Sequence, residues 1–130
     1  MSVYLKQNDL LEDEAFTIAE ANEVNFGDMV LSSSVPVWVI FGARCSTPCR
    51  TLFSTLSGIK TLLGDMAKLV KVNADESIGL GIWYGVDSLP TLLYFEKGMV
   101  CARIVGMSDR ESLLTKMKRI MEGQFDEEGS

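Results

Sequence analysis

The chain has 130 residues, of which 47% are hydrophobic and 23% charged, a balance typical of a single globular domain. Its formal net charge of −6 argues against a nucleic-acid-binding protein, because phosphate backbones are bound by clustered Lys and Arg. With no histidine and three cysteines, the chain excludes a Ser-His-Asp or Cys-His nucleophile pair and a four-cysteine zinc site, so that thiol exchange or no chemistry remains.

The two ends of the chain are interpreted as extensions of one domain. Residues 1–14 are mostly polar and lack the apolar centre of a signal peptide, so they are assigned to an N-terminal extension. No run of 18 apolar residues predicts a transmembrane helix. We therefore expect a cytoplasmic protein with its domain at 15–122 and an acidic tail at 123–130.

The first half of the domain predicts two strands and two helices. A short strand is expected at 16–19, and a helix at about 26–33 with Asn25 as its cap. The strongest strand signal is the uncharged, β-branched and aromatic run 35–41, typical of a strand buried on both faces. A helix is expected from about Ser46, with Pro48 in its first turn. Its apolar face is formed by Leu52, Phe53, Leu56, Ile59, Leu62 and Leu63.

The second half predicts a strand, a helix, a hairpin and a final helix. The strand is expected at 69–72, the helix at 76–84 and the hairpin strands at 91–95 and 99–105. A capping box from Ser108 to Glu111 opens the last helix. The apolar stripe of that helix is Leu113, Leu114, Met117, Ile120 and Met121. The resulting order, β-α-β-α-β-α-β-β-α, predicts an α/β fold with a mixed central sheet and helices on both faces.

Several segments agree with landmarks of a known family. The apolar strand that begins at Pro36 leads into Pro48-Cys49 at a helix start, and Leu89-Pro90-Thr91 follows at the spacing of a cis-proline segment. Over roughly residues 16–121 the chain resembles the thioredoxin family. The resemblance implies the thioredoxin fold and thiol–disulfide exchange with no cofactor.

The resemblance also shows where this chain departs from the family. The family motif Trp-Cys-Gly-Pro-Cys falls on residues 45–49, Cys-Ser-Thr-Pro-Cys. The nucleophilic cysteine is then replaced by Ser46, the resolving cysteine is Cys49, and the buried proton-transfer acid is replaced by Ile40. If helix geometry reached back to Cys45, its Cα would lie about 6 Å from that of Cys49, a separation that permits a disulfide.

Each residue of the candidate site has a structural reading beside its functional one. In the structural alternative, Ser46 is simply a helix N-cap and has no chemical role. Cys45 is then a small side chain on the rim of the site, and Cys49 is an inert thiol in the core. Cys101 lies within a strand, away from the expected site, and is assigned to packing. The candidate catalytic residues are Cys45, Cys49 and Ser46, the candidate binding residues are Thr47, Pro48, Leu89, Pro90 and Trp83, and no metal site is expected.

Three functions remain open. The first is a thiol–disulfide exchange protein in which Cys45 attacks or pairs and Cys49 resolves. The second is a redox-inactive module of the same fold that binds or chaperones proteins. The third is a sensor in which Cys45 alone takes up oxidant or glutathione. The expected partners are a protein that presents a disulfide or an extended segment, with a thioredoxin reductase or glutathione, and neither nucleic acid nor membrane.

Overall fold

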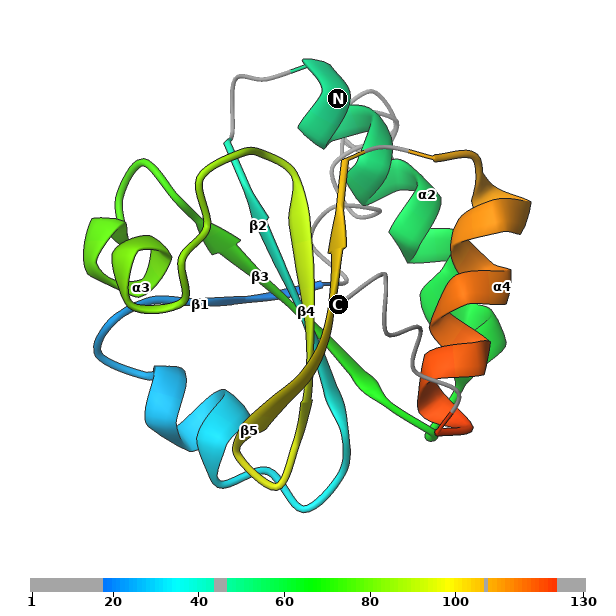
Figure 1. Cartoon of the computed structure of the whole chain (residues 1–130), viewed down its shortest axis with the longest axis horizontal. Coiled ribbons are helices and arrows are strands. Elements are labelled where there is room, and N and C mark those ends of the chain that lie inside the picture. The colour runs from blue at the N-terminus through cyan, green and yellow to red at the C-terminus, as the bar shows by residue number, and fades with distance from the viewer. Residues whose placement is uncertain (1–17, 44–46, 107, 124–130) are drawn as a thin grey trace, which may run out of the picture.

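The computed structural model describes residues 18–43, 47–106 and 108–123, and for residues 47–51 and 53 it describes the backbone alone. Figure 1 shows a central twisted sheet between two layers of helices. The strands are β1 (Ala19–Ala21), β2 (Val37–Gly42), β3 (Lys68–Asn73), β4 (Thr91–Glu96) and β5 (Met99–Val105). The helices are η1 (Gly27–Leu31), α2 (Thr47–Leu63), α3 (Ile78–Trp83) and α4 (Arg110–Met121). This order confirms the predicted α/β fold.

Strand β2 is the centre of the five-stranded sheet, whose order is β1-β3-β2-β4-β5. It pairs in parallel with β3 and in antiparallel with β4. All six of its residues are buried, because neighbouring strands and helices cover it on every side. The uncharged run that predicted a strand buried on both faces is therefore confirmed.

The sheet separates two apolar cores. Alternate residues of a strand point to opposite faces, so Trp38 and Ile40 enter one core, while Val37, Val39 and Phe41 enter the other. The first core lies under α2 and α4, which run side by side in Figure 1. The second lies under η1 and α3. Within the described ranges, no helix is both long and apolar enough to cross a membrane.

The start of the domain differs from the prediction. The first strand occupies Ala19–Ala21, and residues 16 and 17 lie outside the described ranges. The predicted cap Asn25 was wrong, because its Oδ1 accepts a hydrogen bond from the Asn22 amide at 2.7 Å. The following helix is a single π turn that begins after Phe26 without a side-chain cap.

Two helical predictions also need correction. Asp109, and not Ser108, caps α4, since its Oδ1 accepts a hydrogen bond from the Ser112 amide at 2.8 Å. Leu62 was assigned to the buried face of α2 but is 54% exposed, whereas Leu56 and Ile59 are fully buried. At 100° per residue, Leu62 lies on the flank of the stripe that faces the sheet.

Candidate functional site

The candidate site lies at the end of β2, where the chain leaves the centre of the sheet. Strand β2 ends at Gly42, and α2 begins five residues later at Thr47. Pro48 therefore stands in the first turn of the helix, as the sequence predicted, where its missing N–H costs nothing. Cys49 is the third residue of this helix. Cys45 and Ser46 lie outside the described residues.

The segment that contains Pro90 reaches the same end of the sheet. Thr91, the first residue of β4, pairs with Phe41, the last residue of β2 before Gly42. Pro90 and Gly42 are therefore neighbours across the two strands. Thr91 at the start of β4 also pairs with Val105 at the end of β5, and in Figure 1 these strand ends and the start of α2 all lie towards the top of the molecule. The backbones of the first turn of α2 and of the Pro90 segment thus lie towards the same end of the sheet.

Hydrogen bonds on both sides fix the Pro90 segment. The Pro90 carbonyl accepts a hydrogen bond from the Gly106 amide at 2.9 Å, just after β5. The Thr91 hydroxyl donates to the Ser88 carbonyl at 2.8 Å. The Leu89–Pro90 peptide bond is cis, with Pro90 buried and Leu89 38% exposed. Of this pair, Leu89 therefore offers the accessible apolar surface.

The central strand supplies no acid beneath the start of α2. Ile40 is fully buried and belongs to the same apolar cluster as Leu52 of α2 and Leu92 of β4. Leu92 is also its pairing partner on β4. An aliphatic side chain cannot accept or return a proton, so position 40 contributes only packing. In the described part of the chain, no group of His, Cys, Asp or Glu side chains could hold a metal ion.

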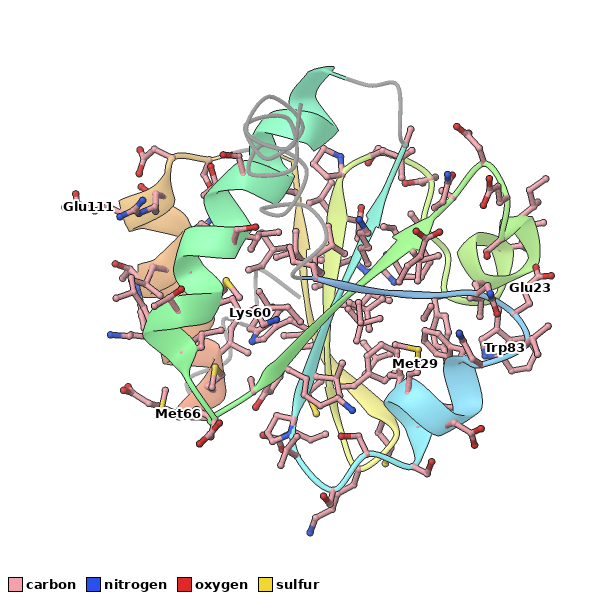
Figure 2. All side chains as sticks on the ribbon, turned by 180° about the vertical axis from the view of Figure 1, so that it is seen from behind. Glu23, Met29, Lys60, Met66, Trp83 and Glu111 are labelled. Carbon is pink, nitrogen blue, oxygen red and sulfur yellow. The ribbon has the colours of Figure 1, made fainter. Side chains whose placement is uncertain are left out.

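Trp83 lies away from the start of α2. It ends α3, and its side chain is 79% exposed. Figure 2 shows Trp83 beside Glu23 on one side of the molecule, whereas α2 lies on the other side of the sheet. Of the five candidate binding residues, the structure therefore places four at the β2 end and Trp83 elsewhere.

Cys101 lies at the opposite end of the sheet from the candidate site. Tyr94 pairs with Ala102 and Phe95 pairs with Val100, which leaves Cys101 as the extra residue of a β-bulge. Its side chain packs against the core under α2 and α4. Burial raises the pKa of this thiol, and the nearby carboxylate of Glu96 raises it further. Cys101 is therefore a poor nucleophile, in agreement with the packing role expected from the sequence.

Sequence reasoning missed two contacts that hold α3 in place. The Arg103 guanidinium donates to the carbonyl oxygens of Tyr84 and Gly85, which precede the Pro90 segment. The Glu23 carboxylate accepts a hydrogen bond from the Gly79 amide at 2.6 Å. Both contacts join residues distant in sequence, so no local pattern indicates them. In the sequence, the one sign of a close approach is the glycine at position 79. The structure explains that glycine, because a Cβ there would lie 2.5 Å from the Glu23 carboxylate.

Comparison with known proteins agrees with this geometry. A family model described as Thioredoxin matches residues 17–119. The M-type chloroplastic thioredoxin of Chlamydomonas reinhardtii is 36% identical over 106 residues, which cover 79% of this chain and 76% of the relative. Thioredoxin 1 of Synechococcus elongatus is 34% identical over 101 residues, 78% of this chain and 94% of the relative. The thioredoxin of Rickettsia typhi is 33% identical over 97 residues, 75% of this chain and 92% of the relative.

Proposed function

Because the chain belongs to the thioredoxin family, we propose that it is a thiol–disulfide exchange protein whose reactive pair is Cys45 and Cys49. Its relatives carry the name thioredoxin, which supports protein disulfide oxidoreduction as the general activity. The substrate would be a protein that presents a disulfide, or an extended segment, to the Pro90 side of the site.

The observation that carries this proposal is the position of Cys49 in the first turn of α2, directly after the central strand. The exposed amides and the dipole at a helix start favour an anion, so they lower the pKa of a thiol nearby. Pro90 lies across from the end of β2, so a peptide chain held there would lie beside that helix start.

The exchange is a two-electron transfer. A thiolate of the pair attacks one sulfur of the substrate disulfide, forming a mixed disulfide and releasing the other substrate sulfur as a thiolate. The second thiol then displaces the substrate and closes the Cys45–Cys49 disulfide. The substrate disulfide is reduced to two thiols while the pair is oxidised. A thioredoxin reductase or glutathione would return the two electrons.

Two departures predict that this exchange is slow. Ser46 stands where the family resemblance puts the nucleophilic thiol, and a serine hydroxyl needs a base that a chain without histidine does not offer. Ile40 provides no carboxyl to take the proton of Cys49. The same buried Ile40 favours the alternative, a redox-inactive module that binds a protein partner at the Pro90 segment without exchange.

Counting thiols separates the two functions. The protein is equilibrated in oxidising and in reducing glutathione, alkylated, and analysed by mass spectrometry. We expect a shift of two electrons confined to Cys45 and Cys49. In parallel, reduction of insulin disulfides should be lost in Cys45→Ala and in Cys49→Ala and retained in Cys101→Ala, the matched control at the other end of the sheet.

Three outcomes decide between the proposals. Absence of both the two-electron shift and insulin reduction would overturn the exchange function. Partner capture that survives the double change Cys45→Ala with Cys49→Ala would then support the binding module. A glutathione adduct on Cys45 alone, with Cys49 unmodified, would instead identify a sensor.

The cytoplasmic location and the boundaries of the domain at 15 and 122 stay predictions. Helix α4 ends at Met121, next to the predicted boundary. Among the relatives, the Chlamydomonas protein is chloroplastic. Fluorescence microscopy of the tagged full-length chain would test the location.

A further inference from the structure

Exposed apolar side chains gather on α3 and on the loop beside it. Val24, Trp83, Ile82 and Ile78 are 93%, 79%, 75% and 60% exposed. Among the described residues, these are four of the five most exposed large apolar side chains. We call them the α3 face. Their concentration in one place distinguishes them from the single exposed apolar residues that are normal on a protein surface.

The helical repeat of α3 determines which of its residues face solvent. Leu80 and Gly81 face the sheet, where Gly81 is buried and Leu80 packs against the core. Ile78 and Ile82 are four residues apart and therefore share the opposite side of the helix. Because the inward face is already packed, the outward isoleucines contribute nothing to the core.

Glu23 joins the loop that contains Val24 to this helix. Its carboxylate accepts the hydrogen bond from the Gly79 amide, and Gly79 lies four residues before Trp83. Figure 2 shows the Glu23 and Trp83 side chains close together on this side of the molecule. The loop that contains the exposed Val24 therefore lies against α3, although the two segments are far apart in sequence.

The segments that build this surface are acidic. Residues 18–35 and 73–90 contain no Lys or Arg, and their six acids are all exposed: Glu20, Glu23, Asp28, Asp75, Glu76 and Asp87. Three cations lie against these segments: Lys68 donates a hydrogen bond to the Met29 carbonyl, Arg103 donates to the Tyr84 and Gly85 carbonyls, and Lys71 is the register partner of Glu20 between β3 and β1. These cations keep their charge, but the six exposed carboxylates outnumber them, so the net charge around the α3 face is negative.

We propose that the α3 face binds a basic amphipathic segment of a partner protein. Aliphatic side chains of that segment would cover Val24, Ile78 and Ile82, while its Lys or Arg side chains would pair with the surrounding carboxylates. An Arg could also stack on the exposed Trp83 ring. Acidic surroundings repel nucleic acid and anionic membranes, so a cationic protein segment is the occupant that the charges select.

This surface is distinct from the exchange site. Trp83 and α2 lie on different sides of the sheet in Figure 2, and the α3 face contains no cysteine. The inference therefore goes beyond the proposed exchange function and does not depend on it. A partner could be held at α3 while its disulfide, or a neighbouring chain, is presented elsewhere.

The test uses a synthetic peptide of Leu and Lys at helical spacing, labelled with fluorescein, and the full-length protein. We expect saturable binding by fluorescence anisotropy, weakened by added salt because the charges are exposed. Amide resonances of α3 and of the loop at Val24 should shift in the ¹⁵N-labelled protein. Replacing Leu by Ser in the peptide, or Lys by Glu, should abolish binding.

Variants assign the binding to the α3 face. Ile82→Ser with Trp83→Ser should weaken it by about tenfold or more, as expected for apolar and aromatic anchors. Asp75→Asn with Glu76→Gln should weaken it by about threefold and reduce its dependence on salt. The matched control is Met99→Ser with Glu111→Gln, since Met99 is 69% exposed on β5 and Glu111 lies on α4. This control should bind like the wild type.

Several results would overturn the proposal. These are equal binding by all variants, shifts confined to α4 or β5, and no binding of the Leu and Lys peptide. A dimer in sedimentation that is lost with Ile82→Ser and Trp83→Ser would assign the face to a second copy of this chain instead. Cys45→Ala with Cys49→Ala should bind the peptide normally, which separates this surface from the exchange function.

Discussion

The Arg103 guanidinium on β5 donates a hydrogen bond to the Tyr84 carbonyl at the end of α3, with a distance of 2.6 Å between nitrogen and oxygen. Its other terminal nitrogen lies 3.3 Å from the Gly85 carbonyl oxygen. One side chain thus closes the last turn of α3 and the start of the connection to Pro90. Cations at a helix end stabilise it, because they face the unpaired carbonyls and the negative end of the dipole.

Replacing this cation should loosen the connection between α3 and β4. For Arg103→Met we expect a loss of about 1–2 kcal/mol in the free energy of unfolding, typical of charged hydrogen bonds that are partly exposed. Amide hydrogen exchange should become faster at Val86, whose amide donates to the Gly81 carbonyl at 2.8 Å. Urea titration and exchange measurements test this. Arg119→Met, an exposed change on α4, is the control, and an equal effect there would contradict the clamp.

Two leucines of α2 should differ in their contribution to stability. Leu56→Ala removes a fully buried side chain from the core under α2, which should cost about 2–5 kcal/mol. Leu62→Ala removes a side chain that is 54% exposed and should cost less than about 1 kcal/mol. Thermal unfolding of both variants compares the same chemical change on one helix. Equal losses would contradict the assigned faces of α2.

The cap of α4 should make stability depend on acid pH. Hydrogen bonds from the Ser112 amide and then the Ser112 hydroxyl hold the pKa of Asp109 below its usual value. The folded protein is therefore stabilised above the pKa of the unfolded chain, and this contribution is lost as pH falls through the folded pKa. Asp109→Ala should lower the melting temperature at neutral pH and flatten its acid decline.

Ser108→Ala is the matched control for the cap. Because Asp109 accepts the Ser112 hydrogen bond, Ser108→Ala should leave both the melting temperature and its pH dependence unchanged. Asp109→Asn keeps an oxygen acceptor but cannot titrate, so it should retain most of the stability and lose the pH dependence. If Ser108→Ala lowered the melting temperature more than Asp109→Ala does, the assignment of Asp109 as the cap would be wrong, and the capping box expected from the sequence would be correct.

Tyr94 should affect stability in alkali. Burial, and next its hydrogen bond to Glu96, raise the pKa of Tyr94 well above the ordinary value of a tyrosine. A raised folded pKa contributes stability that is present below the unfolded pKa and lost as pH rises towards the folded value. Unfolding measured upwards from about pH 9 should therefore show a steeper decline for the wild type than for Tyr94→Phe. If the stability of the two proteins declined equally with rising pH, the raised pKa of Tyr94 would be contradicted.

The two tryptophans should report different surroundings. Trp38 is fully buried against Tyr94, with 4.7 Å between ring centroids, whereas Trp83 is 79% exposed. Trp83→Phe should shift the fluorescence emission to shorter wavelength and remove most of the quenching by acrylamide. When both proteins are unfolded in urea, acrylamide should quench the tryptophan fluorescence of the wild type and of the variant to the same degree. Strong quenching of folded Trp83→Phe would mean that Trp38 is accessible.

Pattern and composition predicted most of the secondary structure. The uncharged run at 35–41 indicated a central strand because only a strand covered on both faces tolerates such a sequence, and β2 has that position. The hairpin strand 99–105 was predicted with its observed bounds. Helix caps were less certain, because Ser108 and Asp109 are both good caps and only the backbone angles select Asp109.

Trp83 and Ile82 illustrate a different limit. A short apolar segment is compatible both with a buried helix and with a helix that exposes an apolar face. Periodicity shows which residues share a face, but it does not show whether another element covers that face. The packing of Leu80 inwards, together with the tether of Glu23 to Gly79, turns Ile82 and Trp83 towards solvent. The tether joins residues 23 and 79, which no local sequence pattern relates to each other.

By itself, the sequence determined the order of strands and helices, the absence of histidine, and the residues that stand at the start of α2. Local propensity and the alternation of apolar residues are sufficient for these. Only the tertiary structure decided that Pro90 meets the end of β2, that Arg103 closes α3, and that an apolar and acidic face is left open. These features depend on strand register and on contacts between distant segments, which are set when the whole sheet is assembled.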